Sequence, residues 1–271
     1  MMLGLGFGIH RLALCRRGNG AAPPPPPPPP SFPYQLTLAA WYDPSDLGTL
    51  FQDTVGTVPV AADGDPVALM QDKSGNGHHM TQSDPARQPV YRSAGGLHWL
   101  ETDGADDSMS TPARLGLPGD PSVTISAAIR VLAATNSVER VLYLGTPGNN
   151  YTLCASVGTG GFSWRHNNGN AVFGSTVLNT DLVATWLRGA GATYAGGRFW
   201  LNDAEQTQTG NSGATRIPTD ASQGAHLFAH GNSTNNPARL RFYGMVVTPT
   251  DADAQRQTIT THLGGKVGLV L

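Results

Sequence analysis

The chain has 271 residues, of which only 13% are charged, and its formal net charge is -2. So few charges make no basic surface for nucleic acid or for an anionic membrane, and we expect neither partner. Glycine (34) and proline (21) are plentiful, which favours many short strands joined by tight turns, and hence an all-β protein.

The first 20 residues form an apolar, glycine-rich leader. Its glycines alternate with the apolar residues Leu3, Leu5, Phe7 and Ile9. In an extended strand this alternation places the apolar side chains on one side, where they can dock on a sheet edge or in a groove of a partner. We predict that residues 1–20 are a docking peptide. A leader that is disordered in isolation, and lipidation at Cys15, are the alternatives.

Residues 21–33 are a proline-rich linker that contains eight consecutive prolines, residues 23–30. Proline has no backbone N–H and a fixed φ, so the run adopts polyproline II rather than helix or sheet. At roughly 3.1 Å per residue the eight prolines make a semi-rigid rod of about 25 Å. We predict a stalk between an anchor and a displayed domain. A plain linker, or a ligand for a proline-binding module, is the alternative.

Residues 34–271 have the pattern of one large β-domain. Alternating or apolar runs bounded by turn residues predict a series of strands. These are 34–42, 67–71, 97–102, 123–132, 140–145, 151–157, 161–166, 171–177, 182–189, 191–194, 197–201, 226–230 and 240–247. The run 123–132 is the most apolar and is predicted to be a central strand, and Asn202-Asp203 is predicted to be a hairpin tip.

One helix is predicted, near the C-terminus. Thr248 or Thr250 can cap it, and Asp251 and Asp253 suit the positive end of its dipole. The pair Gly264-Gly265 is expected to end it.

Five stretches of this domain resemble the concanavalin A-like, laminin-G-like jelly roll of bacterial and phage surface proteins. They are 38–43 (LAAWYD), 72–78 (DKSGNGH), 100–108 (LETDGADDS), 198–203 (RFWLND) and 242–247 (FYGMVV). The resemblance implies an all-β, concanavalin A-like jelly-roll β-sandwich with a short C-terminal helix, preceded by the extended anchor and the polyproline stalk.

The leader and stalk further resemble those of phage virion proteins in which a short N-terminal peptide plugs into a capsid or tail protein. This implies a display protein at the phage particle surface, a head or tail decoration or fibre, that assembles as a homo-oligomer. Its lectin-like domain is expected to contact host-surface glycan or simply to decorate the particle. The alternative is a secreted or cell-surface bacterial carbohydrate-binding module.

Catalysis is not expected from the sequence. Jelly-roll hydrolases carry their acids on one strand as Glu-x-Asp-x-x-Glu, and this run does not occur. Instead, Glu101, Glu139 and Glu205 are scattered along the chain. We therefore predict that the protein is not an enzyme.

Four aspartates suggest a calcium site, because calcium takes several oxygen ligands in flexible geometry. These are Asp103, Asp106 and Asp107 in one turn, with Asp72 from an earlier loop. Laminin-G-like relatives often hold calcium at such a rim. The alternative is that the aspartates cap turns by accepting backbone N–H groups. No other cofactor is expected.

A polar cluster beside a tryptophan suggests a sugar site, because an exposed aromatic ring can stack on a pyranose while amides bind its hydroxyls. The predicted site residues are Trp164, Arg165, His166, Asn167 and Asn168, with Asn150 and Tyr151 from the neighbouring strand. A core position for Trp164 is the alternative. The other tryptophans, Trp41, Trp99, Trp186 and Trp200, are expected in the core.

Overall fold

A computed structural model gives the structure of the chain. It describes residues 36–117, 121–145, 153–166, 169–190, 196–212, 224–229 and 237–271, together with Phe32 and Thr193. The predicted docking residues Leu3, Leu5, Phe7 and Ile9 and the proline linker lie outside the described residues. The chain divides after Tyr34, and the unit that follows is the one described below.

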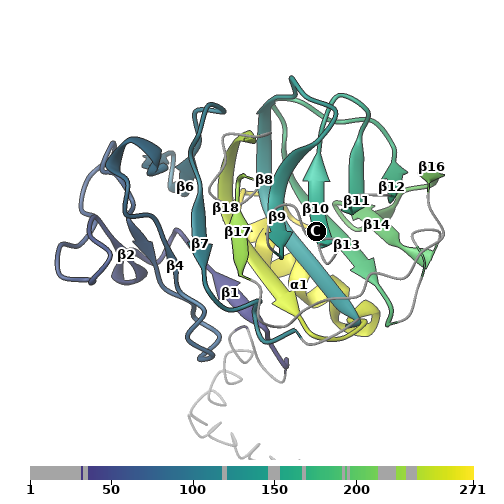
Figure 1. Cartoon of the computed structure of the whole chain (residues 1–271), viewed down its shortest axis with the longest axis horizontal. Coiled ribbons are helices and arrows are strands. Elements are labelled where there is room, and N and C mark those ends of the chain that lie inside the picture. Colours follow the sequence, from purple (N-terminus) through teal and green to yellow (C-terminus); the bar gives the residue numbers. More distant parts are fainter. Residues whose placement is uncertain are drawn as a thin grey trace, which may run out of the picture. The chain divides into compact units, whose positions relative to one another are not determined.

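Two antiparallel sheets make up this unit, which confirms the all-β prediction (Figure 1). Sheet A has eight strands: β15 (Ala204–Glu205), β14 (Arg198–Leu201), β13 (Asp181–Arg188), β8 (Val123–Ala133), β18 (Arg239–Thr248), β6 (Leu97–Glu101) and β5 (Val90–Ala94), with β1 (Ala40–Tyr42) also paired to β18. Sheet B has ten: β16 (Gln208–Ser212), β12 (Gly169–Phe173), β11 (Phe162–His166), β10 (Leu153–Val157), β9 (Glu139–Leu144), β17 (Ala225–Leu227), β7 (Met109–Thr111), β4 (Met80–Thr81), β3 (Leu69–Met70) and β2 (Leu50–Phe51). In the described connections lie the short 3-10 helices η1 (Leu47–Thr49) and η2 (Pro85–Arg87).

Strand β8 is central in sheet A, as predicted, with β13 on one side and β18 on the other. Its residues Ile125, Ala127 and Ile129 belong to the core. The residues that alternate with them, Thr124, Ser126 and Ala128, face the opposite side of the sheet, as the two-residue repeat of a strand requires. A strand that is buried on both faces reads as a continuous apolar run, which is why its sequence was the clearest.

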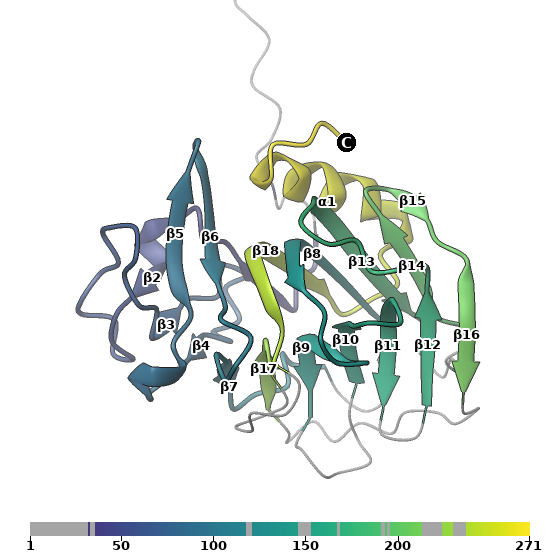
Figure 2. The ribbon, with the colours of Figure 1, turned by 90° about the horizontal axis from the view of Figure 1, so that it is seen from above.

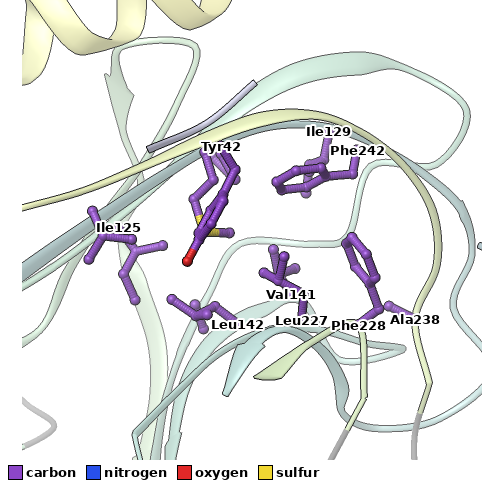
Figure 3. Packing of buried hydrophobic residues seen from close by; sticks show 14 of the residues in the cluster. Tyr42, Ile125, Ile129, Val141, Leu142, Leu227, Phe228, Ala238 and Phe242 are labelled. Atoms are coloured by element: carbon purple, nitrogen blue, oxygen red, sulfur yellow. The ribbon is translucent and has the colours of Figure 1, made fainter. Parts of the chain in front are cut away.

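The core lies between the two sheets. Figure 3 shows Tyr42, Ile125, Ile129 and Phe242 of sheet A facing Val141, Leu142 and Leu227 of sheet B, with Phe228 and Ala238 beside them. An aromatic cluster extends this core: the rings of Phe162 on β11 and Phe199 on β14 stack with centroids 4.9 Å apart. Each such pair adds roughly 0.5–1.5 kcal/mol to the burial of its apolar area.

The outer face of sheet A is covered by the helix α1 (Asp253–Lys266), which packs over β8, β13 and β18 (Figure 2). Trp200 lies between Arg198 and Arg256, whose guanidinium carbons are 4.5 and 4.7 Å from its ring centroid. Trp41, Trp99, Trp186 and Trp200 are all buried, as predicted. Trp186 alone of these four joins the inter-sheet cluster.

The predicted ends of the helix were wrong. Thr248 is the last residue of β18, and Ala252 stands at the N-cap without a side-chain cap bond. At the other end the helix continues through Gly264 to Lys266. Glycine at position 264 is instead explained by packing, since a Cβ there would lie 3.0 Å from Leu271 Cδ1. Among the described residues, no helix has the length and apolarity to cross a membrane.

Candidate functional site

A hollow of about 250 Å³ opens where β6 ends and where β5 and β18 begin. We call it the β6 pocket. Its lining is polar except for one valine: Val90, Arg92, Glu101, Thr102, Asp103, Asp107 and Arg239. The β5–β6 hairpin that carries three of these seven residues stands at one side of sheet A (Figure 2).

Thr102 fixes the floor of the β6 pocket. Its buried hydroxyl donates to the carbonyl of Ala238 (2.6 Å) and accepts the N–H of Leu240 (3.0 Å). The end of β6 is thereby tied to the start of β18. Gly104 follows with φ +77°, and a Cβ there would lie 2.7 Å from the Cβ of Arg239. Glycine is therefore required for the turn and for the close approach of Arg239.

Three of the four predicted aspartates do come together. The carboxylate oxygens of Asp103, Asp106 and Asp107 lie within 4.8 Å of one another. They also organise the turn, because Asp107 Oδ2 accepts the N–H of Asp103 (2.8 Å) and Asp103 Oδ1 accepts that of Ala105 (2.7 Å). These bonds are the ones expected of turn-capping aspartates, which was the alternative to a calcium site. Calcium stays a prediction for the three oxygens.

Asp72 is not part of that group, so the prediction of a four-aspartate set was wrong. Its carboxylate accepts the backbone N–H groups of Trp41 (2.9 Å), Ser74 (2.9 Å) and His78 (3.1 Å). These bonds shape the loop 72–78 and join it to β1. Both segments are rich in Asp and Gly, and the sequence could not show that they lie apart.

The pKa of Asp107 is unusually high for an aspartate. Burial, followed by the neighbouring charges of Asp103 and Asp106, raises its pKa to about 7, against the lowering effect of its bond from the Asp103 N–H. Its carboxyl group therefore exchanges a proton near neutral pH. Glu101 is held differently, since it accepts from Trp99 Nε1 (3.1 Å) and from Arg241 Nε (3.0 Å).

A second hollow, of about 390 Å³, lies by β14 and β15 and is larger. Its two charged residues satisfy each other: Arg198 donates to both oxygens of Glu205 (2.8 and 3.0 Å) and also pairs with Asp253. A carboxyl group with a strongly shifted pKa in a hollow is the better indicator of function. The β6 pocket is therefore the candidate site.

The residues of the predicted sugar cluster that lie on β11 do not share one face of the strand. Trp164 is 1% exposed, and its indole N–H donates to the carbonyl of Leu187 (3.1 Å) inside the sandwich. A stacking role for Trp164 was therefore wrong, because no ligand reaches its ring. Arg165, the next residue on β11, faces the opposite side and is half-buried.

The other members of this cluster are not described. Asn150, Tyr151, Asn167 and Asn168, and the side chain of His166, lie outside the described residues. Sequence reasoning also missed Arg92, Glu101 and Arg239 of the β6 pocket. Arg239 meets the acidic turn only because β18 pairs with β6, across more than a hundred residues of chain. The one local signal was Gly104 within a run of aspartates.

Of three comparisons with known proteins, only the comparison with solved structures finds similar proteins. No family model matches the chain, and no curated protein matches it. The sialidase of Trypanosoma rangeli in complex with sialic acid is similar, with a TM-score of 0.54 and 12% identity over 86% of this chain and 33% of that chain. A GH54 α-L-arabinofuranosidase soaked with a cyclic sulfate inhibitor has a TM-score of 0.60 and 14% identity over 84% of this chain and 63% of that chain.

An arabinofuranosidase complexed with arabinofuranosyl-α-1,2-xylobiose is also similar, with a TM-score of 0.54 and 14% identity over 74% of this chain and 51% of that chain. The chain thus spans about a third of the sialidase and between a half and two thirds of the arabinofuranosidases. At this identity the likeness shows the fold, a two-sheet β-sandwich shared with part of each protein.

These similarities correct the prediction that the protein is not an enzyme. The similar solved structures named above are a sialidase and two arabinofuranosidases. The missing Glu-x-Asp-x-x-Glu run therefore cannot exclude catalysis, because it tests only one way of placing two acids on a sandwich. The β6 pocket places acids in a turn instead.

Proposed function

We propose that the domain binds glycan and that the β6 pocket is its site. The observation that carries this proposal is one polar hollow in which carboxylates and guanidinium groups converge around Asp107. Sugar hydroxyls both donate and accept hydrogen bonds, so they need acceptors such as Asp103 beside donors such as Arg239. The fold of the solved glycosidases supports the proposal, and within it we assign the sandwich to the concanavalin A-like jelly rolls.

Arg239 provides the sharpest test, because it is exposed and lines the pocket without forming its turn. The full chain is applied to a glycan array, and the glycans retained are titrated by calorimetry with wild type and with Arg239→Gln. We expect Arg239→Gln to weaken binding about tenfold, as loss of a charged hydrogen bond does. Arg198→Gln removes the same charge at the other hollow and is expected to change binding less than about twofold. Equal effects of the two variants, or no glycan retained, would contradict the proposal.

Glycoside hydrolysis is a second candidate function, and the pKa of Asp107 favours it. Such enzymes use one carboxylic acid to protonate the leaving oxygen and one carboxylate on the other side of the scissile bond, about 5–5.5 Å apart when configuration is retained. Below pH 7 most Asp107 carboxyl groups hold their proton and so can act as the acid, while one carboxylate oxygen of Asp103 lies within 4.8 Å of one of Asp107. The test is release of reducing ends from the glycans that bind. Asp107→Asn, which cannot give up a proton, should abolish the release; release that persists in this variant contradicts the assignment.

The particle on which the domain is displayed is a further proposal, supported by the sequence of the leader and the linker. We propose that residues 1–20 dock into a capsid or tail protein of a phage, that residues 21–33 form the stalk, and that residues 34–271 are displayed as a homo-oligomer. The alternative remains a secreted or cell-surface bacterial carbohydrate-binding module. A chain that lacks residues 1–20 should no longer co-purify with particles. If it stays with them, the docking proposal is wrong.

A further inference from the structure

The outer face of sheet B carries a row of side chains that the β6 pocket does not use. The row is polar and partly exposed at its two ends and buried in the middle, at Tyr143 and Cys154. Residues paired across neighbouring strands form this row: Ser110, His226, Tyr143, Cys154, Arg165 and Asn170. They alternate with the core residues Leu142, Ala155, Trp164 and Ala171 on the same strands. The strands β9, β10, β11 and β12 that bear the row lie side by side in Figure 2.

Two arginines converge on this face. Arg165 of β11 is paired with Cys154 of β10, and Arg140 of β9 is paired with Ser156, two residues further along β10. Against the raising effect of burial, both guanidinium groups lie close enough to the Cys154 thiol to lower its pKa. Burial first, and then the charge of Arg140, lowers the pKa of Arg165. The two positive groups therefore reach toward each other over β10.

Neither arginine has a carboxylate partner among the described residues. Arg140 Nη1 donates to the carbonyl of Val138 at 3.5 Å, its side chain also hydrogen-bonds the Cys154 thiol, and its Nε is buried without a hydrogen-bond partner among the described residues. Burial raises the pKa of the Cys154 thiol, so a neutral thiol rather than a thiolate lies between them at neutral pH. Most other described arginines are paired with a carboxylate: Arg92, Arg130, Arg198, Arg241 and Arg256.

Two partly buried like charges without a counter-charge cost free energy that a bound anion offsets. We propose that this face binds an acidic oligosaccharide, with one sugar carboxylate held between Arg140 and Arg165. A planar carboxylate suits the fork of a guanidinium group, which donates two parallel hydrogen bonds to it. Tyr143 and Cys154 are covered in the middle of the row, so a neighbouring sugar unit would lie at the end where Arg165 and Asn170 are partly exposed.

The amide group of partly exposed Asn170, which is paired with Arg165, lies at this end of the row for the sugar hydroxyls. The inference takes from the proposed function only that the ligand is a glycan. Its site lies on the other sheet from the β6 pocket, so each site can be removed separately.

The test titrates the full-length chain with trigalacturonate and with the neutral galactose trimer, by calorimetry. We expect the charged trimer to bind and the neutral one to bind at least tenfold more weakly. Arg165→Gln and Arg140→Gln should each lower the affinity for trigalacturonate about tenfold, as loss of a charge-assisted bond does. Arg165→Lys keeps the charge without the fork and should lose affinity too. Arg198→Gln on sheet A is the control for net charge and should change nothing beyond about twofold.

Equal loss in Arg198→Gln and Arg165→Gln would show diffuse attraction and overturn the site. Equal affinity for the neutral trimer, or no binding of trigalacturonate, would overturn it as well. A sulfated oligosaccharide or a nucleic acid that binds more tightly with the same arginine dependence would overturn the carboxylate assignment. Arg239→Gln should leave trigalacturonate binding intact. If trigalacturonate fails while other glycans bind in an Arg239-dependent way, this inference falls and the proposed function stands.

Discussion

Asp107 shows how a single residue's surroundings set its chemistry. The same type of side chain is exposed at Asp103 and buried at Asp107, and burial raises the pKa of Asp107 to about 7. An aspartate in an unfolded chain has a pKa of about 3.9. Between these values the folded protein holds a proton that the unfolded chain has lost, so the free energy of unfolding falls as pH rises from about 4 to 7.

We therefore predict that Asp107→Asn is more stable than wild type at pH 7.5 and equally stable at pH 4. The gain should be on the order of 1 kcal/mol, because solvent in the open pocket screens the full linkage effect. The measurement is urea unfolding of both proteins from pH 4 to pH 8, in chelator so that a bound cation does not hold Asp107 ionised. Other acids, such as Asp43 with its lowered pKa, contribute equally to both curves. A difference that is constant with pH would contradict the prediction.

Gly104 is the residue whose replacement should damage the β6 pocket most directly. Alanine at φ +77° is strained, and its Cβ would meet Arg239. We expect Gly104→Ala to cost about 2–3 kcal/mol of unfolding free energy. Gly75→Ala is the matched control, because Gly75 also has a positive φ (+88°) but nothing within 4 Å of its Cβ. Its cost should be about 1–2 kcal/mol. Equal costs in thermal unfolding would show that the contact with Arg239 is unimportant.

At the scale of the element, β11 explains both what the sequence could predict and what it could not. A strand over residues 161–166 was predicted, and β11 covers Phe162–His166. The sequence did not determine which face of β11 lies in the core. Phe162 and Trp164 lie on one face and Arg165 on the other, and either face suits a half-exposed strand. Only the pairing with β10 and β12 shows that Trp164 points into the core.

Replacement of neighbouring residues on β11 should therefore give opposite results. Trp164→Ala removes a fully buried indole and its bond to Leu187, and should cost about 3–5 kcal/mol. Arg165→Ala, on the outer face, should change unfolding by less than about 1 kcal/mol. Chemical denaturation of the two variants and of wild type measures both changes in the free energy of unfolding. A stable Trp164→Ala variant that lost glycan binding would restore the stacking role that the structure excludes.

Hairpins and caps differ in how far local sequence determines them. Asn202-Asp203 was predicted as a hairpin tip, and both residues have a positive φ (47° and 73°), which the turn between β14 and β15 requires. The short strands β2, β4 and β7 were missed, since two or three residues carry no periodic pattern. They are held by sheet pairing rather than by their own sequence.

For the whole molecule, composition predicted the all-β class, but it could not predict the order of the strands in the two sheets. The meander β9–β12 follows the chain order and was predicted from regular turns. In contrast, β17 lies between β9 and β7, so three distant segments become neighbours. The long-range pairing of β18 with β6 likewise brings Arg239 to the acidic turn, whereas Arg140 and Arg165 are aligned within the local meander β9–β11. The β6 pocket thus combines a local acidic cluster visible in sequence with a partner that only the fold supplies.

The central claim is that the β6 pocket binds glycan. The most direct measurement is a nitrogen-15 NMR titration of the full chain with the glycan that the array retains most strongly. We predict shifts concentrated at the amides of Thr102, Asp103, Ala105 and Arg239, and their loss in Arg239→Gln. Shifts confined instead to the hollow beside β14, at Gln206 and Thr207, or an array without any retained glycan, would contradict it.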